Sequence, residues 1–235
     1  MDGVLIDVSA SYRDTARKTA SIFFSACRSA GMLPQPLFEL SDLAYVKQSG
    51  GLNNDWDLTH RVITLLLQKV LISAGWTERS EWDVKLLAEF LAAEKEPLKK
   101  LLMENSSKNP EEADFFYQGD VGSGNIIKQI FQEVYLGGPL FADTYGFHPQ
   151  FYFQDGFILR EKLLVKRAFL ADLSAENILA IATGRPASEA LYPVDKNDIG
   201  FFGKTLLHFD NADTNSFLLN VIILFSFSFF YLIQV

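Results

Sequence analysis

Two short segments combine residue types that suit phosphate chemistry. Near the amino end the chain reads Asp2-Gly3-Val4-Leu5-Ile6-Asp7, and far downstream an apolar run at 177–182 leads into Thr183-Gly184-Arg185-Pro186. Where a strand ends and a helix begins, a threonine hydroxyl and backbone N–H groups can hold phosphate oxygens. Proline is favoured in the first turn of a helix, so the second segment suits such a turn.

Each segment also has a purely conformational explanation. An Asp-Gly pair is a common turn signal, and an acidic residue near a chain end is ordinarily exposed. Gly184 and Pro186 could serve only to turn the backbone from a strand into a helix. Taken alone, neither segment establishes a phosphate site.

The hydrophobic pattern indicates the elements that position these residues. Short apolar runs at 4–6 and 177–182 predict strands, 162–173 can form a helix, and the aromatic stretch 151–158 is strand-like. Helical spacing covers most of the chain between the two segments, at 12–30, 40–47, 58–74, 82–103 and 126–136. This order predicts an α/β core interrupted by an inserted helical block.

With these motifs in place, the sequence resembles the haloacid dehalogenase-like (HAD-like) hydrolase superfamily, subfamily I with a helical cap. Asp2-Gly3-Val4-Leu5 is similar to its first motif, in which two aspartates are separated by one residue. Ala182-Thr183-Gly184-Arg185-Pro186 is similar to its second motif, a serine or threonine that binds the transferring phosphoryl group. The resemblance covers roughly 1–195.

The segment 47–57 further resembles a subgroup that carries its helical cap after the first motif. The resemblance implies that this segment is a cap loop over the substrate, formed by Gly50, Gly51, Asn53, Asn54 and Asp55. The same residues could instead be an ordinary loop and helix start, with Asn54 or Asp55 as the N-cap.

The resemblance implies an α/β fold: an incomplete Rossmann-like core at 1–12 and 160–213, and an inserted helical cap at 13–159. The implied activity is Mg²⁺-dependent hydrolysis of a small phosphorylated metabolite through an aspartyl-phosphate. Asp2 would be the catalytic acid/base and a weak Mg²⁺ ligand, while Thr183, Gly184 and Arg185 would bind phosphate.

Several features of the family pattern are missing from this sequence. The pattern puts the nucleophilic aspartate immediately before Met1, and it puts a phosphate-binding lysine and a metal-binding acidic pair on later strand-helix units. Asp210 and Asp213 are weak candidates for that pair, because the preceding run, 206–209, is a poor strand interrupted by His208. We therefore expect a chain truncated at both ends with little phosphatase activity. The alternative is a non-catalytic, tail-anchored or partner-binding protein.

Composition narrows the possible partners. The 235 residues are 49% hydrophobic, with a formal net charge of -8, which favours a folded domain and argues against a nucleic-acid partner. Cys27 is the only cysteine, so a disulfide framework and a multi-cysteine zinc site are excluded. We expect Cys27 to be a small buried hydrophobe.

The last stretch, 216–235, is an apolar tail that contains no charged residue and is rich in phenylalanine. Its length approaches that of a bilayer span, which predicts a possible transmembrane helix and membrane contact. A buried helix or strand, or translated noncoding sequence, would also fit. The chain shows no secretory signal. The sequence itself leaves the location unknown; the family resemblance implies a soluble protein of the cytoplasm or an organelle, and the tail would allow a membrane location.

Overall fold

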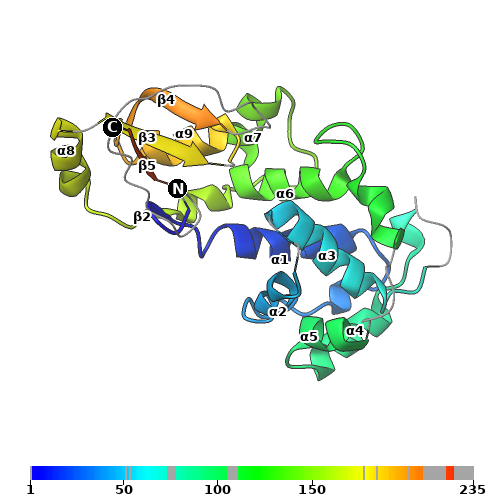
Figure 1. Ribbon diagram of the computed structural model, residues 1–235. Helices are drawn as coiled ribbons and strands as arrows, with labels where there is room; N and C mark the ends of the chain where they lie inside the picture. The colour runs from blue at the N-terminus through cyan, green and yellow to red at the C-terminus, as the bar shows by residue number, and fades with distance from the viewer. Residues whose placement is uncertain are drawn as a thin grey trace. The chain divides into compact units, whose positions relative to one another are not determined.

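Figure 1 shows the computed structural model, which describes residues 2–50, 52, 54–72, 78–104, 111–176, 178–183, 185–200, 202–208 and 221–224. The chain divides into two units. The first unit contains Met1–Ala10 and Ile158–Val235, and the second contains Ser11–Phe157. Together they make an α/β fold with a helical part.

The regular elements of the second unit are helices, joined by turns and irregular segments. Its α-helices are α1 (Tyr12–Ser25), α2 (Leu43–Gln48), α3 (Asp55–Leu67), α4 (Lys85–Ala93), α5 (Pro97–Glu104), α6 (Ile126–Leu136) and α7 (Gly138–Tyr145), and its 3₁₀ helices are η1 (Ala30–Met32), η2 (Arg79–Glu81) and η3 (Glu111–Tyr117). The bounds predicted for α6 coincide with those observed. The single helix predicted at 82–103 is two helices, because Pro97 begins a new one.

The core of the second unit forms where α1 packs against α3 and α6 (Figure 1). Phe23 on α1 lies edge-on to Phe116, with ring centroids 5.2 Å apart, and Trp82 lies edge-on to the same Phe116 ring at 5.6 Å. All three side chains are fully buried. Each contributes about 2 to 3 kcal/mol through the apolar area it removes from water.

The prediction of a strand at 151–158 is wrong, because the carboxylate of Glu133 binds the backbone at the start of this segment. Glu133 is fully buried on α6, and its oxygens accept the backbone N–H groups of Gln150 at 2.9 Å, Phe151 at 2.6 Å and Tyr152 at 2.9 Å. These N–H groups bond to a side chain and so cannot bond to a neighbouring strand. The segment continues into a 3₁₀ helix, η4 (Phe157–Arg160).

The first unit holds two small sheets among its described residues. In one, β1 (Ile6–Asp7) pairs antiparallel with β2 (Lys162–Leu163). In the other, β3 (Ile178–Thr183) is the central strand and pairs in parallel with β4 (Phe202–His208) and β5 (Val221–Leu224). Helices α8 (Arg167–Glu176) and α9 (Ala187–Lys196) complete the unit.

Two strand expectations need correction. The resemblance implied one Rossmann-like core that contains the first strand and the 177–182 run, but the two residues of β1 pair with β2. The helix predicted at 162–173 begins later, at Arg167, because 162–163 forms a strand.

The run at 206–209 was expected to be a poor strand, yet β4 pairs with β3 up to His208. Asp210 and Asp213 lie outside the described residues.

The described part of the apolar tail is a strand. Val221–Leu224 forms β5, so the expected transmembrane helix at 216–235 is wrong for these four residues, and the rest of the tail lies outside the described residues. In the part of the chain that the structure describes, no helix has the length and apolar character needed to span a membrane.

We predict that Glu133→Ala lowers the free energy of unfolding by about 3 kcal/mol, because it leaves buried N–H groups without their acceptor. Urea denaturation measures the change. Glu89→Gln, at an exposed position on α4, is the control and is expected to change stability by about 0.5 kcal/mol or less. Equal effects of the two variants would contradict the structural role of Glu133.

Cys27 provides a second test, because it is 7% exposed and burial raises the pKa of its thiol to about 11. The thiolate, which is the reactive form, appears only as the pH approaches that value. At pH 8 we expect a thiol reagent to label the folded chain about a hundredfold more slowly than the urea-unfolded chain. Similar labelling rates for the two states would refute the burial of Cys27.

Candidate functional site

The turn that follows β3 is where the sequence predicts phosphate binding. Thr183 is the last residue of β3, the central strand of the parallel sheet, and α9 begins at Ala187 immediately after Pro186. The predicted strand-turn-helix is confirmed. Ligands of parallel sheets commonly bind beyond the carboxyl ends of the strands. The first N–H groups of the following helix are suited to anions. Gly184 lies outside the described residues.

Arg185 connects this turn to the amino-terminal motif. Its Nη1 and Nη2 atoms donate to Glu161 Oε2 at 3.0 Å and Oε1 at 3.1 Å, so the guanidinium and the carboxylate form a bidentate pair. Nη2 also lies 2.7 Å from Asp2 Oδ1, and Nη1 donates to the Glu189 carbonyl oxygen at 3.2 Å. The structure thus brings Asp2 to the turn after β3, although the two lie about 180 positions apart in the sequence.

We call Arg185 and its two carboxylate partners, Asp2 and Glu161, the Arg185 cluster. The side chains of Arg185 and Glu161 are 3% and 1% exposed, while that of Asp2 is 25% exposed. Burying a charged group is unfavourable unless a partner of opposite charge and good geometry replaces water. The bidentate pair with Glu161 supplies that partner, and Asp2 lies at the more exposed end of the cluster.

The sequence assigned Asp2 as a possible Mg²⁺ ligand, and the Arg185 cluster opposes that role. A guanidinium 2.7 Å from Oδ1 repels a dication at the same carboxylate. Mg²⁺ also prefers several oxygen ligands in octahedral geometry. Among the described residues, no group of three or more His, Cys, Asp or Glu side chains is arranged to hold a metal ion. We therefore assign no step of a reaction to Mg²⁺ at Asp2.

The predicted cap-loop residues lie in the second unit. Asn54 is the N-cap of α3, where its Oδ1 atom accepts the Asp57 backbone N–H at 2.7 Å. Asp55 begins the helix, and its Oδ1 atom lies 3.7 Å from Lys47 Nζ. Gly50 has a φ of +105° and open space where a side chain would lie. Gly51 and Asn53 lie outside the described residues. The N-cap alternative is confirmed for Asn54.

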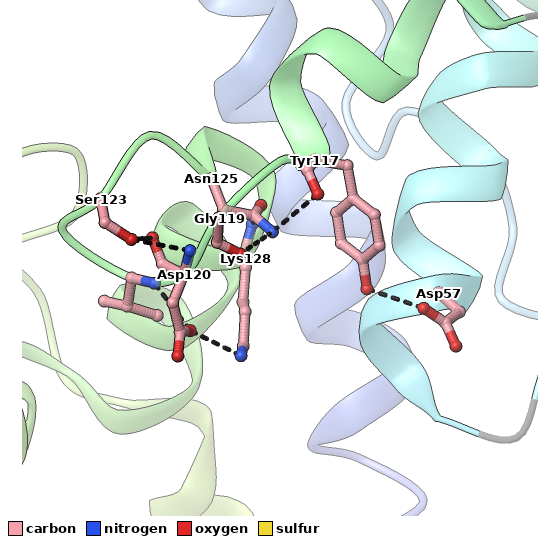
Figure 2. A network of polar contacts seen from close by, with 8 residues as sticks. Asp57, Tyr117, Gly119, Asp120, Ser123, Asn125 and Lys128 are labelled. Carbon is pink, nitrogen blue, oxygen red and sulfur yellow. Dashed lines mark hydrogen bonds and ion pairs between the residues drawn. The ribbon is translucent and has the colours of Figure 1, made fainter.

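A polar network joins the start of α3 to the loop before α6 (Figure 2). Tyr117 donates its hydroxyl proton to Asp57 Oδ1 at 2.8 Å, and Asn125 Nδ2 donates to the Tyr117 carbonyl oxygen at 3.2 Å. Lys128 Nζ lies 2.6 Å from Asp120 Oδ1. Burial and the bond to Asp57 raise the pKa of the Tyr117 phenol, so it stays protonated. The network fixes the loop to α3.

Sequence reasoning missed Glu161 and Glu189. Glu161 lies in a charged triplet, Arg160-Glu161-Lys162, between apolar residues, and nothing in that pattern distinguishes it from a solvated surface segment. Glu189 follows Arg185 by four positions, a spacing common to helix-surface ion pairs. Both glutamates are buried in the structure.

Comparison with known proteins shows likeness in fold. No protein-family model matches the sequence, and the search of curated proteins gave no match. Phosphatase Tt82 from Thermococcus thioreducens is similar in structure, with a TM-score of 0.50 and 18% identity over 88% of this chain and 68% of that protein. A Northeast Structural Genomics Consortium target has a TM-score of 0.49 and 20% identity, over 87% of this chain and 67% of the target. The chain therefore has a phosphatase-like fold.

The Arg185 cluster makes a direct stability prediction. Arg185→Gln leaves Glu161 buried without its charged partner, and we expect the free energy of unfolding to fall by about 3 to 5 kcal/mol. The double variant Arg185→Gln/Glu161→Gln removes both charges and should lose less than the single variant. Urea denaturation of the three chains provides the measurement; equal losses for the single and double variants would mean that the pair is not an ion pair in solution.

Proposed function

We propose that this chain has a phosphohydrolase scaffold of the HAD-like type that binds the phosphate group of a small phosphorylated metabolite at the turn after β3. The observation that carries the proposal is the ion pair between Asp2 and Arg185, which joins the two motifs of the sequence at the carboxyl end of a parallel strand. The likeness in fold to a solved phosphatase supports it.

In this proposal the chain's own residues have separate tasks. Thr183 donates its hydroxyl proton to a phosphate oxygen, while the Gly184 amide and the first N–H groups of α9 hold the others. Asp2 exchanges a proton with the leaving group and water. Because Arg185 already holds Asp2 Oδ1, proton exchange there would disturb a partly buried ion pair. We therefore expect slow turnover or none.

The experiment is calorimetric titration of the purified chain with inorganic phosphate. Replacing Thr183 by Ala removes one hydrogen bond to a charged group, worth about 1.5 to 3 kcal/mol, so phosphate affinity should fall about tenfold to a hundredfold. Thr144→Ala, on α7 of the second unit, is the matched control and should leave the affinity unchanged.

Turnover is measured on the same protein with a panel of phosphate monoesters, with and without Mg²⁺. We expect any rate to fall in Asp2→Asn and to stay the same in Thr144→Ala. Absence of phosphate binding to the unmodified chain, or equal affinity of the Thr183→Ala and unmodified chains, would overturn the proposed site.

A further inference from the structure

The Arg185 guanidinium is directed toward carboxylates within its own unit. Its two terminal nitrogens lie within 3.1 Å of three carboxylate oxygens, two from Glu161 and one from Asp2. The side chain is 3% exposed, so the positive charge is inside the protein rather than at its surface. An arginine that served mainly to receive phosphate would present its donors to an incoming anion.

Glu161, and not Asp2, anchors this arrangement. Glu161 is bidentate and 1% exposed, whereas Asp2 contacts the guanidinium through one oxygen and is 25% exposed. Glu161 also immediately precedes β2, which pairs with β1, and the Leu164 N–H donates to the Leu5 carbonyl oxygen at 2.9 Å. The antiparallel pair therefore positions Glu161, and an isolated bridge between Asp2 and Ile6 connects Asp2 to β1.

The charges of the cluster do not favour a phosphate ligand on Arg185. One guanidinium is shared by two carboxylates, and the carboxyl group of Glu189, in the first turn of α9, is 2% exposed as well. A phosphate dianion placed against Arg185 would have to replace a carboxylate that already has bidentate geometry. It would also meet the remaining negative charge at short range.

We propose that Glu161 is a positioning residue of the phosphate site. It holds the Arg185 guanidinium on Asp2, so that phosphate at the end of β3 is bound by Thr183 and backbone N–H groups and not by Arg185. This inference rests on the proposed function. In this inference Glu161 orients the Arg185 guanidinium toward Asp2. We call the resulting arrangement, in which Arg185 holds Asp2 in place, the clamp.

Calorimetric titration with inorganic phosphate tests the inference in Glu161→Gln and in the double variant Arg185→Gln/Glu161→Gln. In Glu161→Gln the guanidinium loses a charged partner and the site loses one negative charge, so phosphate should bind about threefold to tenfold more tightly. The double variant has the net charge of the unmodified chain but no arginine, and its affinity should stay within about threefold. Asp172→Asn, at an exposed position on α8, removes the same charge elsewhere and should change affinity by less than about twofold.

Two results would overturn the inference. Equal or weaker phosphate binding by Glu161→Gln would show that Glu161 does not restrain Arg185. A loss of tenfold or more in the double variant would show that Arg185 itself binds phosphate.

A urea-denaturation cycle separates failure of the inference from failure of the proposed function. If neither the unmodified chain nor Glu161→Gln binds phosphate, the proposed function fails. The clamp is then judged by whether Asp2→Asn shifts the unfolding midpoint more in the Glu161→Gln background, where Arg185 has lost its bidentate carboxylate partner, than in the unmodified chain. Equal shifts in the two backgrounds would overturn the clamp as well.

Discussion

A buried guanidinium that must be neutralised constrains the first unit. Arg185 lies two positions after the end of a central parallel strand, and its side chain is removed from water. A charge in that position is tolerated only with carboxylate partners of good geometry. Glu161 and Asp2 supply them. Glu161 immediately precedes β2, which pairs with β1, and Asp2 is bridged to Ile6 of β1. The amino-terminal segment is thereby tied to the turn that ends β3.

The second unit also contains a buried acidic side chain, and there backbone N–H groups are its main partners. Glu133 is buried on α6, and its oxygens accept hydrogen bonds from three successive backbone N–H groups and from Gln129 Nε2 at 3.0 Å. These donors replace the water that would bind an exposed carboxyl group. The same bonds fix the backbone at 150–152 in an irregular conformation. In both units, then, a buried carboxylate determines where a non-helical segment of chain lies.

Local patterns in the sequence predicted some elements well. The helix α6 was predicted to the residue, because its apolar spacing is strict and Asn125 caps its first turn, where its side chain accepts the Lys128 N–H at 2.8 Å. The strand β3 and the helix after Pro186 were also predicted, since a short apolar run followed by Gly and Pro is a local signal. An α/β fold with a helical part followed from the order of these elements.

Three of the errors share one physical origin, which is pairing between distant residues. The stretch 151–158 has strand composition, but Glu133 takes its N–H groups. The segment at β1 has a local strand pattern, but its pairing with β2 depends on contacts between distant residues, which the sequence pattern does not reveal. Glu161 was missed for the same reason: its importance lies in Arg185, 24 positions away. Hydrophobic periodicity carries no information about such partners.

The residue type at position 185 has an explanation that does not require a ligand. Lysine would offer a single ammonium, which cannot form two parallel bonds to one carboxylate while contacting a second. Arginine has a planar fork that does both, with Glu161 on Nη1 and Nη2 and Asp2 on Nη2. A Thr-Gly-Arg-Pro turn can therefore retain its arginine for internal pairing alone. Under the proposed function, phosphate at this turn is bound by Thr183 and by backbone N–H groups, while Arg185 is paired with the acidic residue of the first motif, Asp2.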